Sequence, residues 1–161
     1  MYRPDLVDVW IFRVAPAGLE LLLMRRAAGR ILPGLWQGVS GSLEAGERIA
    51  AGALRELGEE TGFDEDDIEA FYDLDQVNQF HEPSVDAVVT SAVFAVRVRS
   101  DAEPVLSHEH DAHRWVTPAK ALELIVWPAY RESIARVERD LLHPVREAWF
   151  RLRPDGRRMV D

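Results

Sequence analysis

The chain has 161 residues, a formal net charge of −9 and no cysteine, and its length suits a single domain over residues 1–161 with a sizeable core. The lack of cysteine excludes disulfides, thiolate nucleophiles, zinc–thiolate sites and iron–sulfur clusters. The negative charge argues against nucleic-acid duplexes and membranes as partners, and without a bilayer-length apolar run or a signal peptide we expect a cytoplasmic protein.

Segments rich in β-branched and aromatic residues alternate with turn residues along the chain. They predict strands over residues 6–13, 19–25, 35–42, 68–80, 85–99 and 113–116. Helices are predicted over residues 47–61, from Pro118 onward and over residues 128–142. Strands that outnumber helices, with a helix between them, indicate an α+β or α/β sandwich around a mixed β-sheet.

The C-terminal extension, residues 143–161, carries no clear periodic pattern. Trp149, Phe150 and Leu152 could pair back onto the sheet as a strand. Residues 153–161 are charged and contain turn residues, so we expect them to be loose.

The predicted helix over residues 47–61 has two distinct faces, and Gly62 stands where a glycine would end it. Its apolar arc, expected to pack on a sheet, consists of Ala50, Ala53, Leu54 and Leu57. Glu56, Glu59 and Glu60 share the adjacent arc, where three carboxylates repel one another near a helix C-terminus. A hard divalent cation such as Mg²⁺ would relieve that repulsion. The helical wheel alone leaves a merely solvated acidic face equally open.

Gly52 lies inside this helix, close to the acidic arc. A glycine there costs roughly 1 kcal/mol relative to alanine. The missing side chain is expected to leave room for a ligand.

The segment from Gly41 to Phe63 resembles the Nudix box: a glycine, five residues, a glutamate, seven residues, then Arg-Glu-apolar-x-Glu-Glu-x-Gly-apolar. Every specified position matches, namely Gly41, Glu47, Arg55, Glu56, Leu57, Glu59, Glu60, Gly62 and Phe63. The resemblance implies the Nudix α/β/α sandwich over most of residues 6–142. It also implies that metals are held by the Gly41 carbonyl and by Glu56, Glu59 and Glu60. Arg55 would then orient a glutamate, and Glu47 would be mainly structural.

Two further segments, residues 35–42 and 106–115, resemble bacterial dihydroneopterin triphosphate diphosphatases and their nucleotide-hydrolysing relatives. Trp127 followed by Arg131 fits the same group. This resemblance implies that Glu109 is a further metal ligand. Residues 76–85 depart from the pattern of that group, so the ring attached to the phosphates stays open.

Together these patterns predict a hydrolase dependent on Mg²⁺, with Mn²⁺ as a substitute, in which Glu59 or Glu56 takes a proton from water. The expected substrate is a nucleoside triphosphate or dihydroneopterin triphosphate, cleaved to a monophosphate and pyrophosphate. The alternatives are an ADP-ribose or dinucleoside polyphosphate hydrolase, and a non-catalytic nucleotide-binding module. A homodimer is one expected assembly.

Four residues are candidates for binding the substrate. Arg25 follows a predicted strand and is expected to contact it, as the subgroup resemblance implies, and Ser40 is expected to contact it or to close a turn rather than to act as a nucleophile. Trp36 and Phe80 are candidates for stacking on a ring, with core packing as the alternative for each. A zinc site built from His108, His110 and His113 is an alternative hypothesis, although the spacing of these histidines gives no helical pair.

Overall fold

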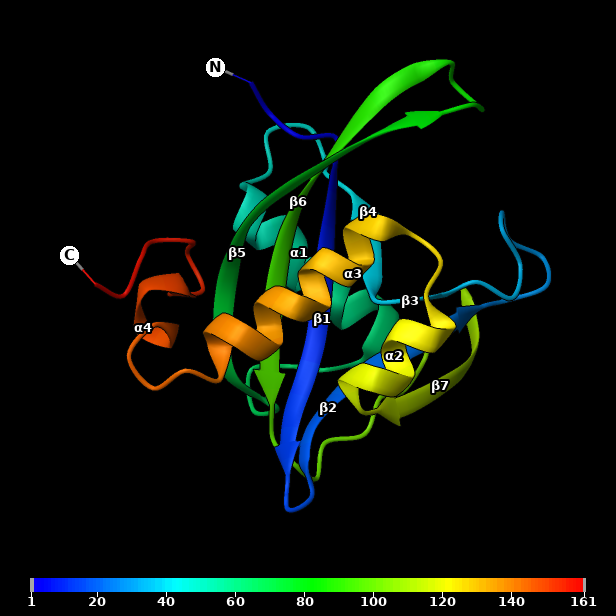
Figure 1. Cartoon of the computed structure of the whole chain (residues 1–161). Helices are drawn as coiled ribbons and strands as arrows, with labels where there is room; N and C mark the ends of the chain where they lie inside the picture. The colour runs from blue at the N-terminus through cyan, green and yellow to red at the C-terminus, as the bar shows by residue number, and fades with distance from the viewer. Residues whose placement is uncertain (1, 161) are drawn as a thin grey trace.

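The computed structural model describes residues 2–160 and contains one mixed β-sheet with helices on both faces (Figure 1). The strands run in the order β3-β2-β1-β6-β5-β8, with β4 paired to β1 and β7 paired to β2. Their bounds are β1 Leu6–Ala15, β2 Gly18–Arg26, β3 Trp36–Gln37, β4 Val39–Ser42, β5 Ile68–Glu82, β6 Ala87–Val98, β7 His110–Val116 and β8 Arg151–Leu152. Strands β1 and β6 are parallel, whereas the other pairs are antiparallel.

The helices form the two outer layers of the sandwich. In Figure 1, α1 lies behind the sheet, while α2 and α3 cross in front of it. Their bounds are α1 Ile49–Thr61, α2 Pro118–Leu124, α3 Pro128–Arg136 with a π-helical turn η1 Val137–Leu141, and the short α4 Glu147–Phe150. The α+β class and the mixed sheet expected from the sequence are therefore confirmed.

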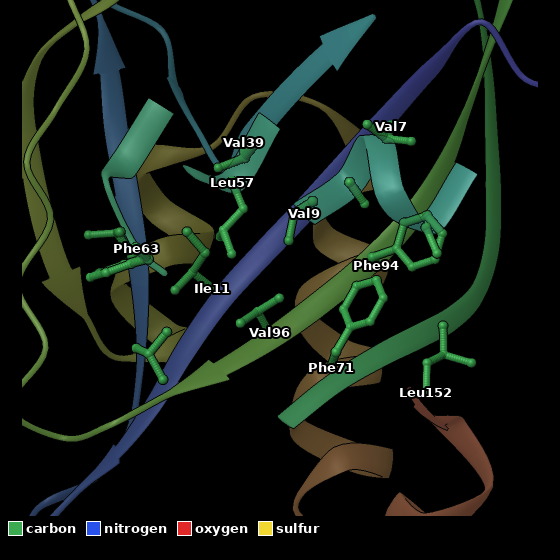
Figure 2. Packing of buried hydrophobic residues seen from close by; sticks show 14 of the residues in the cluster. Val7, Val9, Ile11, Val39, Leu57, Phe63, Phe71, Phe94, Val96 and Leu152 are labelled. Carbon is green, nitrogen blue, oxygen red and sulfur yellow. The ribbon is translucent and has the colours of Figure 1, made fainter. Parts of the chain in front are cut away.

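Alternation along β1 divides the core into two halves. Val7, Val9 and Ile11 point toward α1 and pack with Leu57 and other residues of that layer, as Figure 2 shows. Trp10 and Phe12 point to the opposite face of the sheet, toward α2 and α3. Each fully buried large apolar side chain contributes roughly 1.5–3 kcal/mol, so both helical layers are held firmly against the sheet.

The predicted bounds of several elements need correction. Helix α1 begins at Ile49 rather than at Glu47, because the Glu47 carboxylate closes a turn by accepting from the backbone N–H of Glu44 at 3.0 Å. The predicted strand 35–42 is interrupted at Gly38, where a Cβ would lie 2.8 Å from the carbonyl oxygen of Val9. Strand β7 begins at His110, three residues earlier than predicted, because it pairs with β2 as far as Arg26.

The last part of the chain folds back on the sheet only briefly. Trp149 and Phe150 lie in α4, so the strand predicted there is wrong for both residues. Leu152 does pair with β5, opposite Phe71. Within residues 2–160, no helix has both the length and the apolar character that crossing a bilayer requires.

Candidate active site

The C-terminal half of α1 carries the acidic stripe, and the chain on both sides of α1 fixes its position. At its end, Gly62 adopts a left-handed conformation with φ 70°, and its N–H donates to the Gly58 carbonyl at 2.8 Å. At its start, the loop from β4 wraps over the helix, and a Cβ on Gly52 would lie 2.4 Å from Leu43 and 2.9 Å from Glu47. The expected room for a ligand at Gly52 is therefore wrong, since the protein itself fills that space.

Arg55 forms hydrogen bonds with several residues of the acidic face and of the loop before α1. Its guanidinium donates to both carboxylate oxygens of Glu47, at 2.8 and 3.0 Å, and to the carbonyl of Ser42 at 3.0 Å. The same group donates to Glu56 at 2.8 Å and to Glu59 at 3.1 Å. These hydrogen bonds lower the pKa of Glu47 to about 2 and raise the pKa of Arg55. These hydrogen bonds fix the loop between β4 and α1 against the helix, and they orient Glu56 and Glu59.

Gly41 on β4 lies directly against the carboxylate of Glu56. A Cβ on Gly41 would lie 1.9 Å from the carboxylate carbon of Glu56, so any larger residue would push that carboxylate out of its position. Burial raises the pKa of Glu56, and the hydrogen bond and charge of Arg55 oppose that rise. The nearby charges of Glu59 and Glu109 add to it. The structure thus brings the predicted ligands Gly41 and Glu56 together.

Glu60 is the buried member of the stripe, with 3 % of its surface exposed. Burial, together with the negative charges of Glu109 and Glu56, raises its pKa to about 8, and a hydrogen bond with the backbone of Ser40 opposes that rise. Its Oε2 has no hydrogen-bond partner. The nearest cationic candidate is His110 Nδ1, 3.8 Å away and also without a partner, and burial lowers the pKa of that histidine.

Glu109 precedes β7 and completes the group of carboxylates. Its charge acts on both Glu60 and Glu56, so it lies near these two carboxylates. Its own carboxylate accepts an ion-paired hydrogen bond from Arg30. Among residues 2–160 no three acidic or histidine side chains converge closely enough to hold an ion as they stand. Arginines form ion pairs with Glu56, Glu59 and Glu109.

The donor set nevertheless fits a hard divalent cation. Glu60 carries a buried carboxylate oxygen without a partner, and the negative charges of Glu109 and Glu56 act on it. Oxygen ligands of this kind suit Mg²⁺. The histidines fit zinc less well: His108 and His113 are exposed, His110 is buried, and His113 lies 3.6 Å from Glu103.

Ser40 and Asp8 form a polar link through the sheet from the carboxylates to its other face. The backbone of Ser40 contacts Glu60, and its side chain hydrogen-bonds Asp8, its register partner on β1. Asp8 is buried, which raises its pKa, and it also accepts from Asn78 at 3.4 Å. The hydroxyl of Ser40 therefore has a carboxyl partner. Sequence reasoning missed Asp8, because a single acidic residue inside an apolar strand carries no motif.

Arg25 and Trp36 lie together on the face of the sheet opposite to α1. Trp36 is partly buried against the core beneath α2 and α3, with the guanidinium carbons of Arg25 and Arg114 at 5.9 and 5.0 Å from its ring centroid. Arg25 donates to Asp111 at 2.6 Å. Its neighbour Arg26 follows the same strand and by sequence could equally meet a phosphate, although only Arg25 was predicted to contact the substrate; Arg26 lies near Glu60 and lowers the pKa of that carboxyl.

Phe80 lies apart from Trp36. It is 41 % exposed and pairs with Val89 near the end of the β5–β6 hairpin. Strands β3 and β5 are four steps apart in the sheet, which at about 4.8 Å per step separates them by roughly 19 Å. A single ring therefore cannot stack on both Trp36 and Phe80.

The sequence matches one family over most of this architecture. The family described as NUDIX domain matches residues 4–137, which include the acidic helix and Glu109, and the chain belongs to that family. Two proteins of this fold, 27 % and 26 % identical to the chain, are described as a hydrolase and a pyrophosphohydrolase, and the family uses divalent metal ions. The Nudix resemblance of the box is thereby confirmed.

Solved structures share the fold. A NUDIX hydrolase from Listeria monocytogenes is 27 % identical, with a TM-score of 0.74 over 86 % of this chain and 94 % of its own. The dihydroneopterin triphosphate pyrophosphohydrolase of E. coli is 26 % identical, with a TM-score of 0.70 over 83 % of this chain and 94 % of its own.

A sequence relative from Myxococcus xanthus is named an octanoyltransferase and is 41 % identical over 137 residues. The match covers 83 % of this chain but only 37 % of that protein. The chain thus spans little more than a third of the length of the relative, whose name describes the whole protein.

Proposed function

We propose that the protein is a Mg²⁺-dependent pyrophosphohydrolase that splits a triphosphate of a purine- or pterin-like ring into a monophosphate and pyrophosphate. The observation that carries the proposal is the buried carboxylate of Glu60, whose Oε2 has no hydrogen-bond partner, beside Glu56 and Glu109. Such a site is unfavourable unless a cation balances it. Mn²⁺ should substitute for Mg²⁺, because both favour carboxylate oxygen.

The residues that would hold the cation are Gly41, Glu56, Glu59, Glu60 and Glu109. When bound, the cation would neutralise phosphate charge and lower the pKa of a coordinated water. Arg55 keeps Glu56 and Glu59 in place through hydrogen bonds of 2.8 and 3.1 Å. Either of these two carboxylates is positioned to accept the proton of the attacking water.

The substrate side of the proposal rests on the likeness to the E. coli dihydroneopterin triphosphate enzyme and on the surface around Trp36. Arg25 beside Trp36 offers a cation next to an aromatic face, and Ser40 joins this side of the sheet to the carboxylates. Ring stacking is worth roughly 1–3 kcal/mol and tolerates different rings. Phe80 is a second, separate stacking candidate.

The test is a hydrolysis screen with Mg²⁺ over nucleoside triphosphates, oxidised nucleotides, dihydroneopterin triphosphate, nucleotide sugars, ADP-ribose and dinucleoside polyphosphates. We expect the highest kcat/KM for a triphosphate, with pyrophosphate released. A preference for ADP-ribose or a dinucleoside polyphosphate would refute the substrate class and leave the phosphate chemistry intact. Metal-bound nucleotide without turnover would instead indicate a binding module.

The proposal also covers the assembly and the cellular setting. A cytoplasmic location and a single domain over residues 1–161 stay predictions from composition and length. A homodimer is proposed as one possible assembly, which light scattering of the purified chain would test.

A further inference from the structure

The loop between β2 and β3 lies beside Glu109 and is anchored at its base. The backbone N–H of Ala27 donates to the carbonyl of Glu109 at 2.9 Å, and that of Gly34 donates to Arg26 at 2.9 Å. The tip is different, because Ile31 and Leu32 are 72 % and 52 % exposed. The backbone therefore fixes where the loop starts and ends, while few buried contacts hold its tip.

One side chain ties this loop to the acidic group. Arg30 donates through Nη2 to Glu109 Oε1, and the two side chains are 36 % and 34 % exposed. Glu109 is the carboxylate whose charge acts on both Glu56 and Glu60. The guanidinium of Arg30 thus binds the carboxylate that a divalent cation would need. The Nε of the neighbouring Arg26 instead donates to the Ile31 carbonyl at 2.6 Å.

We propose that Arg30 is a phosphate-binding residue that Glu109 holds until a divalent cation replaces it. The proposal deepens the proposed function and rests on it, since it requires a cation at Glu109 and a phosphate chain beside that cation. The same oxygen of Glu109 cannot serve both a guanidinium and a metal at full strength. Binding of the cation therefore frees Arg30 at the edge of the site, where the phosphate chain arrives.

The chemistry of the side chain suits this exchange. A guanidinium is planar, always charged and able to donate two parallel hydrogen bonds to a phosphate, as it does to a carboxylate. Arg30 therefore exchanges one anionic partner for another of the same geometry. A partly exposed ion pair contributes only about 0.2–1 kcal/mol, so a divalent cation can displace it readily.

The experiment compares Arg30→Ala with wild type in two binding measurements that need no turnover. First, Mg²⁺ is titrated calorimetrically into the metal-free protein without any phosphate. Removing the competing guanidinium should tighten Mg²⁺ binding about two- to fivefold. Second, inorganic pyrophosphate is titrated in saturating Mg²⁺, and its affinity should fall about tenfold because a charge-assisted contact is lost.

Two matched variants separate this exchange from a general change in charge. Arg153→Ala removes the same charge from an exposed position in the C-terminal extension, and both affinities should stay at the wild-type value. Arg30→Lys keeps the charge without the planar fork, so its pyrophosphate affinity should lie between those of wild type and Arg30→Ala.

Opposite changes in the two affinities are the signature of the exchange. A variant that simply damages the site would weaken both ligands, and that result would overturn the proposal, as would unchanged Mg²⁺ or pyrophosphate binding. Both titrations give an answer even if the substrate screen finds no hydrolysis. Failure of the proposed function is thereby distinguishable from failure of the role of Arg30.

Discussion

Replacing Glu60 by glutamine removes one buried charge while keeping the size of the side chain. In the metal-free protein, burial raises the pKa of Glu60 from 4.5 to about 8, whereas an unfolded chain leaves it near 4.5. A carboxyl with a raised pKa favours folding most below its unfolded pKa, and that contribution is lost as the pH rises toward the folded pKa. Wild type should therefore lose stability relative to Glu60→Gln between pH 5 and pH 8.

The size of this effect follows from the shift. One pKa unit corresponds to about 1.4 kcal/mol, and integration between pH 5 and pH 8 gives a relative loss on the order of 3 kcal/mol. Denaturant unfolding in EDTA at both pH values measures it, with Glu65→Gln, an exposed glutamate just after α1, as the control. Added Mg²⁺ should stabilise wild type more than Glu60→Gln, because the variant lacks a ligating charge.

The same variant should lose about 10²-fold in kcat while remaining folded. A stability difference between wild type and Glu60→Gln that stays constant from pH 5 to pH 8 would refute the account of Glu60 as a charge buried for a cation. So would an equal stabilisation of both proteins by Mg²⁺.

Three other perturbations test separate parts of the site. Exhaustive chelation should abolish hydrolysis, and Mg²⁺ or Mn²⁺ should restore it; full activity in EDTA would exclude the metal mechanism. Gly41→Ala should lower kcat at least about tenfold, since its Cβ would meet the Glu56 carboxylate, whereas Gly29→Ala, which meets nothing within 4 Å, should behave as wild type. Arg25→Ala should raise KM about tenfold with little change in kcat, because a contact made equally in ground and transition states is lost; an equal fall in kcat and kcat/KM would contradict that role.

The acidic helix was predictable because the residues that define its faces are close neighbours in the sequence. Spacings of three and four place Glu56, Glu59 and Glu60 on one stripe, and the apolar residues beside them face the sheet as expected. The space at Gly52 was not predictable, because Leu43 fills it from a loop whose path depends on the pairing of β4 with β1. A helical wheel shows only the side chains of the helix itself and not the residues that pack against it.

The choice between Arg25 and Arg26 shows the same limit in a strand. Both faces of β2 are buried, with Leu22 and Met24 toward α1 and Leu21 and Leu23 toward α2, so the strand has no polar side. A one-residue shift moves every side chain to the opposite face, and a continuous apolar run does not reveal which register holds. The sequence therefore offered two adjacent arginines without showing which of them faces the carboxylates.

The arginine ion pairs of the site explain why a cation is needed at Glu60 in particular. Arg55 balances Glu47, Glu56 and Glu59, and Arg30 balances Glu109. Glu60 is held by neither, because it is buried between α1 and the sheet, where a long cationic side chain would have to lose its water. Ionisation of Glu60 would therefore place a negative charge on a buried oxygen that no arginine pairs with, and a small metal ion fits there. Arg55 holds Glu56 and Glu59 without pairing with Glu60, whereas Arg30 must release Glu109 before a metal can bind that carboxylate.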